Sequence, residues 1–441
     1  MKRIVSLLFL FTFIFVHITA QTIDESREEQ LIENPEKLVS LWNALSRLSL
    51  GGYGEVAYTR NFYSDEWQRF TNPAKYKDAD SHGRFDLPHV VFFVGYDFGK
   101  GWSLNSEIEF EHGGTESAVE MESEEAREYE SEIERGGEVA LEQFWIQKSF
   151  SRAFNIRLGH IIVPVGLTNQ YHLPTEFFTV YRPEGENTIF PCTWHETGIS
   201  VWGRTEHWRY EAQFLPGLDA DRFGSQSFMN GASGSPYEFK IANVYAGAFR
   251  LDNYSVKGLR IGLSGYFGYS FNNSLAKNTK YKQCNGEVTI GTADFHYSGH
   301  NLVARGHFDW AHLNDSEEIT KFNKALPSAS PSPRSPVASD AVTMGIEAGY
   351  DLFAHMDKLN RDNRKCYVFG RYEYYDSMAK VTAGIIDNKS CGKHRMAAGI
   401  NYYPIRDIVI KAEYSKRFYK PPYNDEPSVS LGVAYAGFFT R

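Results

Sequence analysis

Apolar and polar residues alternate along most of the chain from Leu48 onward. In one of the clearest segments Val342 and Ile346 share one face, while Thr343 and Glu347 share the other. Successive side chains of a strand point to opposite faces, so this period of two predicts strands with one apolar and one polar face. About sixteen such segments follow one another, each about ten residues long, as a tilted membrane-spanning strand requires. The predicted strands are 48–59, 85–96, 102–112, 138–149, 154–165, 197–204, 208–215, 240–250, 259–270, 287–297, 302–312, 341–352, 365–375, 393–403, 407–416 and 428–439.

The connections between these segments differ in length according to their order. Those after even-numbered segments are mostly short, such as 97–101 and 404–406, and those after odd-numbered segments are mostly long, such as 166–196 and 313–340. Outer-membrane barrels have this arrangement, with tight turns at one end and long loops at the other. A soluble β-sandwich also alternates residues but has no reason to sort its loops by order. We therefore predict an all-β fold, a transmembrane antiparallel β-barrel over 48–441.

Composition is consistent with a membrane barrel and argues against some partners. Mean hydropathy is -0.43, as expected when only alternate residues face lipid. The 27 Tyr and 32 Phe suit aromatic girdles at the membrane interfaces. The formal net charge of -9 makes nucleic acid a poor partner. We expect the partners to be outer-membrane lipid and small hydrophilic solutes.

The N-terminus predicts export. A basic start, Met1–Arg3, precedes an apolar run, Ile4–Ile18, and small residues before Gln21. This is the pattern of a Sec signal peptide, here 1–20, cleaved near Ala20–Gln21. The predicted location is the outer membrane of a Gram-negative bacterium.

The segment between the signal peptide and the first strand, 21–47, shows a less clear structural pattern. Apolar residues near its end recur at helical spacing, which predicts a short periplasmic helix. A frayed leader fits the same residues.

The connection 166–196 is long and rich in proline and aromatic residues. A loop of this length in a compact β fold is usually functional, and in a wide barrel it can fold inward and narrow the lumen. Its charged residues are the candidates for the constriction, although they could instead brace the loop against the wall by salt bridges. These candidates are Arg182, Glu184, Glu186, His195 and Glu196.

Charged residues of both signs lie on the predicted inner face. Opposed charges across a lumen suit passage of small polar solutes of either sign, whereas selective anion passage requires a dense series of basic donors. The same residues could also be structural partners of one another. The predicted pore-lining residues are Glu107, Glu109, Glu111, Glu142, Arg157, Arg209, Glu211, Arg260, Arg305, Glu347, Arg371, Glu373, Arg395, Lys411 and Glu413.

Several segments form a recognisable set. They are the strand and Pro-x-Gly step Arg157–Gly166, Pro191, the Gly-rich strand Gly198–Gly203, the hairpin 86–112 and the ending 408–418. Together they resemble the phosphate-selective porin O/P family, in the form carried by Bacteroidetes-type bacteria. The resemblance implies a sixteen-stranded barrel, commonly a homotrimer. Phosphate selectivity is what the family name implies, and the mixed charges of the predicted inner face argue against it.

Other chemistry finds little support. We predict no catalytic residues, metal site or cofactor, because His195-Glu196 lacks a second histidine at metalloprotease spacing and no strained G-x-S-x-G turn is present. The four cysteines, at positions 192, 284, 366 and 391, are too few for a disulfide scaffold, although Cys284 could pair with Cys391. The function expected is a passive diffusion porin. The alternatives are an anion- or phosphate-selective porin, a non-conducting adhesion or scaffold barrel, and a barrel-embedded enzyme.

Overall fold

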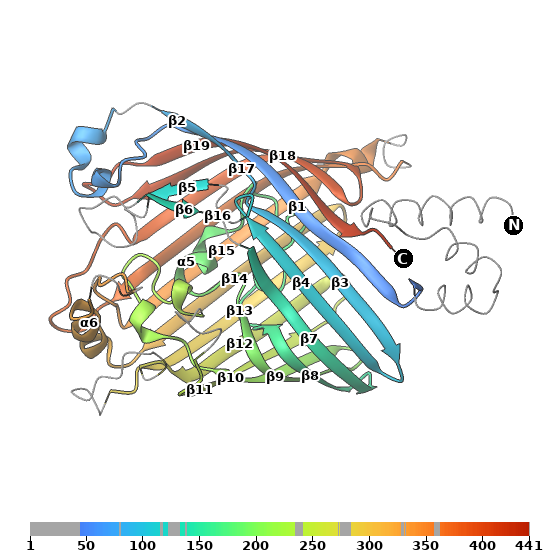
Figure 1. Cartoon of the computed structure of the whole chain (residues 1–441). Coiled ribbons are helices and arrows are strands. Elements are labelled where there is room, and N and C mark those ends of the chain that lie inside the picture. The colour runs from blue at the N-terminus through green and yellow to red at the C-terminus, as the bar shows by residue number, and fades with distance from the viewer. Residues whose placement is uncertain are drawn as a thin grey trace, which may run out of the picture. The chain divides into compact units, whose positions relative to one another are not determined.

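The computed structural model contains one large antiparallel sheet that curves round to meet itself (Figure 1). Residues Leu50–Thr440 form one compact unit. The structure describes residues 45–78, 81–114, 118–121, 133–136, 139–233, 241–271, 273, 284–327, 330, 332–356 and 362–440. Residues 1–44 lie outside this description, so the signal peptide and the helix expected within 21–47 stay predictions.

The strands of the large sheet match the predicted order. Its first half contains β1 (Leu48–Asn61), β2 (His82–Asp86), β3 (His89–Gly99), β4 (Trp102–Glu111), β7 (Val139–Ser151), β8 (Phe154–Ile162), β9 (His195–Arg204), β10 (Trp208–Pro216) and β11 (Tyr245–Asn253). Its second half contains β12 (Leu259–Tyr269), β13 (Glu287–Gly299), β14 (Leu302–Leu313), β15 (Asp340–Asp351), β16 (Lys365–Lys380), β17 (Gly392–Ile405), β18 (Ile408–Tyr419) and β19 (Glu426–Phe438).

The sheet closes where its first and last strands meet. β1 pairs antiparallel with β19, from Gly51 opposite Phe438 to Asn61 opposite Ser428. The sheet has 17 strands, but β2 and β3 both pair with β1. They act as one interrupted strand, because Pro88 between them has no backbone N–H to donate to the ladder. Counting them once leaves sixteen, so the predicted sixteen-stranded antiparallel barrel is confirmed.

The outer face of the barrel is apolar. On β12, Ile261 and Leu263 are 50% and 53% exposed, whereas Arg260 and Ser264 are 4% and 3% exposed. The exposed apolar side chains therefore point outward and the polar ones inward, as a strand between lipid and a lumen requires. Exposed aromatic residues such as Trp208 lie beside the short turns, at the level of a membrane interface. The fold is a transmembrane β-barrel.

The connections follow the predicted order of lengths, with some corrected boundaries. β8 ends at Ile162, so Pro164 lies in the loop rather than in a strand, and the loop to β9 is 163–194. β11 begins at Tyr245, five residues later than predicted. The connection 352–364 between β15 and β16 is longer than its neighbours at that end and contains the 3-10 helix η6 (Leu352–His355).

The long connections contain structure that the alternation did not reveal. They include α5 (Glu184–Ile189), α6 (Ser316–Lys324), a small sheet of β5 (Ala118–Met121) with β6 (Ile133–Gly136), and the 3-10 helices η1 (Trp67–Phe70), η2 (Pro73–Tyr76), η3 (Ala220–Arg222) and η4 (Asn230–Ser233). Among the described residues, no helix has the length and apolar character needed to cross a membrane.

The Pro/Ser-rich stretch Ala325–Asp340 has the composition of a solvated loop, but part of it is buried. Val337 and Ala338 are fully buried. They join an apolar cluster that also contains Trp194 of the β8–β9 loop, Phe223 of the β10–β11 loop and Phe322 of α6. Three long connections thus pack together against the ends of the strands from β8 to β16.

Candidate functional site

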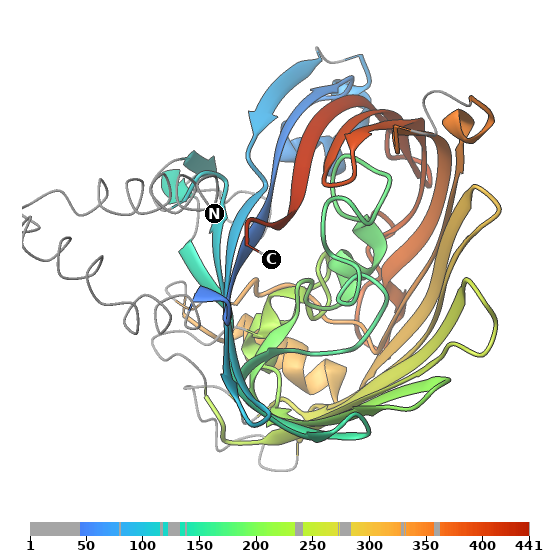
Figure 2. The same ribbon diagram turned by 90° about the vertical axis from the view of Figure 1, so that its right-hand side faces the viewer.

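The β8–β9 loop, residues 163–194, crosses the interior of the barrel. Lys411 Nζ on β18 donates to the carbonyl oxygens of Phe177 at 2.9 Å and of Thr179 at 2.8 Å. The backbone N–H of Val180 donates to Glu413 Oε2 at 2.8 Å. These contacts join a loop that leaves β8 to the wall formed by β18, and Figure 2 shows the segment inside the curved wall of strands.

The loop begins with a turn that is held by Glu186. Its carboxylate accepts the backbone N–H groups of Leu167 at 2.5 Å and Thr168 at 2.7 Å, and also the Thr168 hydroxyl. Gly166 has φ of 84°, and a Cβ there would lie 2.4 Å from Glu186 Oε1. The glycine of the Pro-x-Gly step is therefore required both by the left-handed backbone and by the carboxylate. Glu186 acts as a brace within the loop.

Glu184, at the start of α5, joins the loop to the wall opposite β8. Its carboxylate contacts Arg417 Nη2 at 2.7 Å and Arg395 Nε at 3.3 Å, and it accepts the Tyr375 hydroxyl at 2.5 Å. Burial alone raises the pKa of this carboxyl, but Arg395 and Arg417 outweigh burial and hold the pKa well below its usual range. Glu184 is therefore ionised and anchors α5 on β16, β17 and β18.

Arg182 faces the other side of the interior. Its Nη2 donates to the Tyr53 hydroxyl at 3.1 Å. Burial lowers the pKa of Arg182, but Tyr53 and the carboxylates Glu109, Glu142 and Glu55 raise it above the usual value. The guanidinium is thus a fixed positive charge facing a group of glutamates on the barrel wall.

His195 and Glu196 differ in placement from the other loop candidates. Both belong to β9 rather than to the loop. Glu196 is 1% exposed and faces inward. His195 lies on the outward-facing side of the strand, together with Ile199, and its Nδ1 is 2.6 Å from His160 Nε2. The structure therefore does not place the His195 side chain at the predicted constriction.

The wall from β14 to β18 carries basic and acidic side chains in alternation. Each arginine in this series contacts one or more carboxylates of its own or a neighbouring strand, and the members are almost fully buried. Neighbours in the series include Arg305 with Glu347, Glu347 with Arg371 at 2.8 Å, Arg371 with Glu373 at 2.9 Å, Glu373 with Arg395 at 3.4 Å, and Arg395 with Glu413 at 3.1 Å. All were predicted to line the pore, and the structure places them together as a paired series.

A second paired group lies on β10 to β13. Arg209 contacts Glu211 at 2.6 Å and Asp252 at 3.4 Å, while Arg260 contacts Asp252 at 2.8 Å. Arg250, with a side chain that is 0% exposed, contacts Asp294 at 2.9 Å. Arg250 was not among the predicted pore-lining residues. It is the last residue of the predicted strand 240–250, whereas β11 runs from Tyr245 to Asn253 and contains it.

Arg157 on β8 has partners of a different kind. Its Nε and Nη2 both donate to Gln147 Oε1 at 3.2 Å, and its guanidinium lies 4.4 Å from the centroid of the Trp145 ring. Stacking on an aromatic face suits a planar guanidinium. Arg157 is thus held against the wall beside β7.

The wall formed by β1, β3, β4 and β7 is acidic. The predicted residues Glu107, Glu109, Glu111 and Glu142 lie here together with Glu55. Among the described residues, Glu107 Oε2 and Glu142 Oε1 are buried atoms without a hydrogen-bond partner. Glu55 could have been found from the sequence, because it shares the inner face of β1 with Tyr53 and Ala57, whereas Val56 is exposed. The interior therefore has one acidic wall and two walls of paired charges.

The cysteines add no link between these elements. Cys192, Cys284, Cys366 and Cys391 are all free thiols in the structure, so the pairing of Cys284 with Cys391 is not formed. Burial raises the pKa of Cys284 to about 12 and that of Cys391 to about 11, which leaves both thiols protonated at neutral pH.

Comparisons with known proteins place the chain as follows. No protein-family model matches it, so the resemblance to the phosphate-selective porin O/P family stays a prediction. An uncharacterized protein of Aquifex aeolicus (strain VF5) is 28% identical over 378 residues, which cover 85% of this chain and 76% of that protein.

Similar solved structures are more distant in sequence. An anion-selective porin from Comamonas acidovorans is 10% identical, with a TM-score of 0.49, and the match covers 88% of this chain and 99% of that chain. The outer membrane channel DcaP of Acinetobacter baumannii is also 10% identical, with a TM-score of 0.48 and coverage of 88% and 97%. A loop L8 deletion mutant of OmpT, an outer membrane protein of Vibrio cholerae, is 10% identical with a TM-score of 0.49 and coverage of 89% and 100%.

Proposed function

We propose that this protein is an outer-membrane porin of a Gram-negative bacterium, through which small polar and ionic solutes diffuse passively. The observation that carries the proposal is the closed sixteen-stranded barrel with an apolar outer face and a charged inner face. About eight strands make a barrel that its own side chains can fill, whereas about sixteen leave an aqueous lumen. The ionised side chains inside are the groups that a water-filled lumen accommodates.

The β8–β9 loop, 163–194, is the proposed constriction. Its contacts with β18 and with Arg395 and Arg417 join it to the wall opposite its origin. A loop held by buried ion pairs and backbone hydrogen bonds keeps one position, so we propose a fixed narrowing rather than a moving gate. Glu184 and Arg182 are the residues that position this narrowing, Glu184 on the side of β16 to β18 and Arg182 on the side of the acidic wall.

The charges of the interior support weak cation preference rather than phosphate selectivity. Passage of phosphate needs arginine and lysine donors that are available to replace water around the anion. The inner-wall arginines at 209, 250, 260, 305, 371 and 395 instead contact carboxylates, and Lys411 donates to loop carbonyls. The opposite wall instead carries the carboxyl groups of Glu107 and Glu142, each with one oxygen that makes no hydrogen bond among the described residues.

A specific observation favours a second candidate, a non-conducting barrel. Trp194, Phe223, Phe322 and Val337 come from three different connections and pack in one buried apolar cluster beside β8 to β16. A cluster of this kind fills part of the interior and excludes water there. If it extends across the whole lumen, the barrel serves as a scaffold or an adhesion protein.

Conductance in a planar lipid bilayer separates these functions. The porin proposal predicts ohmic current steps. In a tenfold potassium chloride gradient, the reversal potential should have the sign expected for a weakly cation-selective pore. A strong anion preference would restore the phosphate-selective alternative. Correctly folded, inserted protein that conducts no current would overturn the porin proposal and support the scaffold.

A trimer, as the family resemblance implies, would give steps in groups of three and a trimeric mass by light scattering in detergent.

A further inference from the structure

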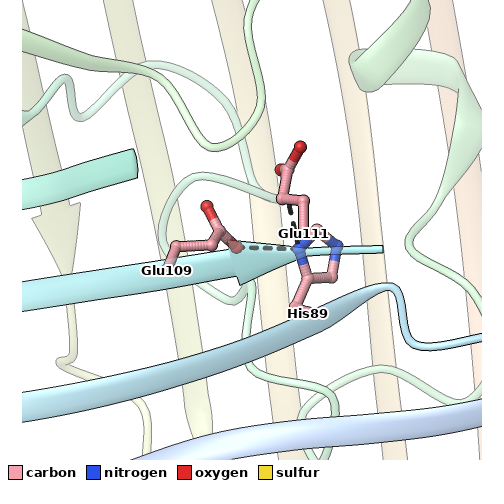
Figure 3. A group of neighbouring side chains, drawn as sticks. All are labelled: His89, Glu109 and Glu111. Carbon is pink, nitrogen blue, oxygen red and sulfur yellow. Dashed lines mark hydrogen bonds and ion pairs between the residues drawn. The ribbon is translucent and has the colours of Figure 1, made fainter. Parts of the chain in front are cut away.

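A histidine lies among carboxylates on the acidic wall, near the long-loop end of β3 and β4. His89 opens β3 and pairs with Glu111 at the end of β4. Glu109 lies two residues before Glu111 and therefore on the same face of the strand. Figure 3 shows the two carboxylates reaching the same ring nitrogen of His89. His89 Nδ1 is 2.7 Å from Glu109 Oε1 and 3.8 Å from Glu111 Oε1.

We propose that His89, Glu109 and Glu111 form a binding site for one divalent transition-metal ion, of the class of Zn²⁺. One ligand atom from each residue lies within 4.8 Å of the other two. Donors of a tetrahedral zinc site are about 3.3 Å apart, given metal–ligand bonds of about 2.0–2.1 Å. The two measured separations lie on either side of this value, so small side-chain rotations bring the donors to the geometry of the ion. Water supplies the fourth ligand.

The surroundings of the site attract a cation. Glu55 Oε1 lies 3.9 Å from His89 Nε2, on the other side of the imidazole. Glu107 and Glu142, which repel Glu109 electrostatically, are 9% and 1% exposed. One oxygen of each makes no hydrogen bond among the described residues. Buried carboxylates without donors are costly unless a proton or a cation neutralises them. Arg182 supplies one positive charge for this group, and a bound divalent ion would supply two more.

The site is also reachable and chemically selective. The side chains of His89 and Glu111 are 15% and 33% exposed, so an ion can enter without unfolding the wall. One imidazole with carboxylates suits zinc and its transition-metal neighbours, whereas calcium and magnesium prefer oxygen ligands alone. We therefore expect Zn²⁺ and Co²⁺ to bind more tightly than Ca²⁺.

A second group of this kind, Glu186, His307 and Asp309, is a weaker candidate. All three residues are buried, and Glu186 already accepts two backbone N–H groups and the Thr168 hydroxyl. His307 Nδ1 and Asp309 Oδ2 are 2.5 Å apart. These contacts make Glu186 an internal brace of the loop, whereas His307 Nε2 and Asp309 Oδ1 are buried without a hydrogen-bond partner among the described residues. The burial of all three residues leaves an ion no direct route from solvent.

The test is metal binding to the full-length folded barrel, purified without an affinity tag. Isothermal titration with Zn²⁺ should give one binding equivalent, and Co²⁺ should give the visible absorption of a low-symmetry four-coordinate site. His89→Gln and Glu111→Gln should each weaken binding by more than about tenfold. Glu111 is the more exposed ligand, so its variant keeps the test valid if the His89 variant folds poorly.

The matched control is His296→Gln. This imidazole also lies on the inner face, but it stacks on Tyr171 with ring centroids 4.8 Å apart rather than among converging carboxylates. Its variant should bind Zn²⁺ as the unmodified chain does. Absence of a Zn²⁺ equivalent, or equal binding by the Glu111→Gln variant, would overturn the site. Binding needs only a folded barrel, so this result is independent of whether the barrel conducts.

Discussion

For a charged residue inside the barrel, the effect of a substitution depends more on its ion-pair partners than on the sign of its charge. Arg395 contacts Glu184, Glu373 and Glu413, which come from the loop and from two different strands. Breaking a buried pair costs more than its formation contributes, because the remaining charge stays buried. The charged residues of the interior are therefore best tested by neutral substitutions of the same size.

Glu184→Gln tests the anchor of the loop. Arg417 keeps Glu426 and Arg395 keeps two other carboxylates, so the cost should be that of an impaired charged hydrogen bond, about 1–3 kcal/mol. The urea midpoint of the folded barrel in lipid vesicles should fall accordingly. Glu206→Gln, in an exposed turn, should leave the midpoint unchanged.

Glu184 should also make the stability of the folded barrel depend on pH. The pKa of Glu184 is lowered in the folded state, so its contribution is present above the unfolded-state pKa and is lost as pH falls below about 4.3. The unmodified chain should therefore lose more stability than Glu184→Gln between pH 5 and pH 3. Parallel losses in the two proteins would contradict the anchor.

Glu176 predicts a dependence of opposite sign. Burial raises the pKa of this loop carboxyl to about 7, and Arg305 lowers it only in part. A raised carboxyl pKa gives stability that is complete at low pH and is lost as pH rises towards about 7. Glu176→Gln should remove this slope from urea midpoints measured between pH 5 and pH 8. An unchanged slope would show that the carboxyl is better solvated than its burial indicates.

At the scale of elements, the connections contain what the alternation of residues cannot show. α5 and α6 are short, six and nine residues, and short helices gain their stability from packing rather than from their own sequence. α5 packs closely on the wall because Gly185 has no side chain to hold it away from Thr343. The backbone N–H of Gly185 donates to Glu373 Oε1 at 3.1 Å.

Gly185→Ala tests that contact. An added Cβ would clash with Thr343 Oγ1, so α5 must move away from β15 or the Thr343 side chain must rotate. Overpacking of this kind costs about 1–3 kcal/mol. We expect a lower urea midpoint and, under the proposed function, a larger conductance step. Gly370→Ala is the control, because nothing lies within 4 Å of its added Cβ. Equal effects of the two substitutions would contradict a tightly seated α5.

At the scale of the whole molecule, the closed barrel reverses the distribution of apolar and charged side chains that is usual in a soluble protein. Its exposed face is apolar and its buried face is charged, because the surroundings are hydrocarbon and the interior holds polar groups. Closure between β1 and β19 also removes free strand edges, which would be costly in lipid.

Leu263→Arg tests the orientation of the barrel wall. Leu263 is 53% exposed in the middle of β12, so arginine there would face hydrocarbon and destabilise the inserted barrel by about 2–4 kcal/mol. Val256→Arg is the control, since Val256 is 59% exposed in the turn 254–258, where the cost should be about 0–1 kcal/mol. Urea midpoints in vesicles measure both. A larger loss for Val256→Arg would contradict the assigned lipid-facing band.

The amino-acid sequence specifies the strands, the polarity of each face and the order of short and long connections, because these depend on neighbours two residues apart. The inward placement of residues such as Glu347 and Arg371 follows from that local pattern. Closure decides the rest, since Glu184 and Arg417 lie 233 residues apart in the chain. His195 shows where prediction from the sequence fails. It is the first residue of β9 rather than part of the loop, and its side chain points to the outer face of the barrel. Only tertiary structure unites His89 with its carboxylates and carries the loop across the interior.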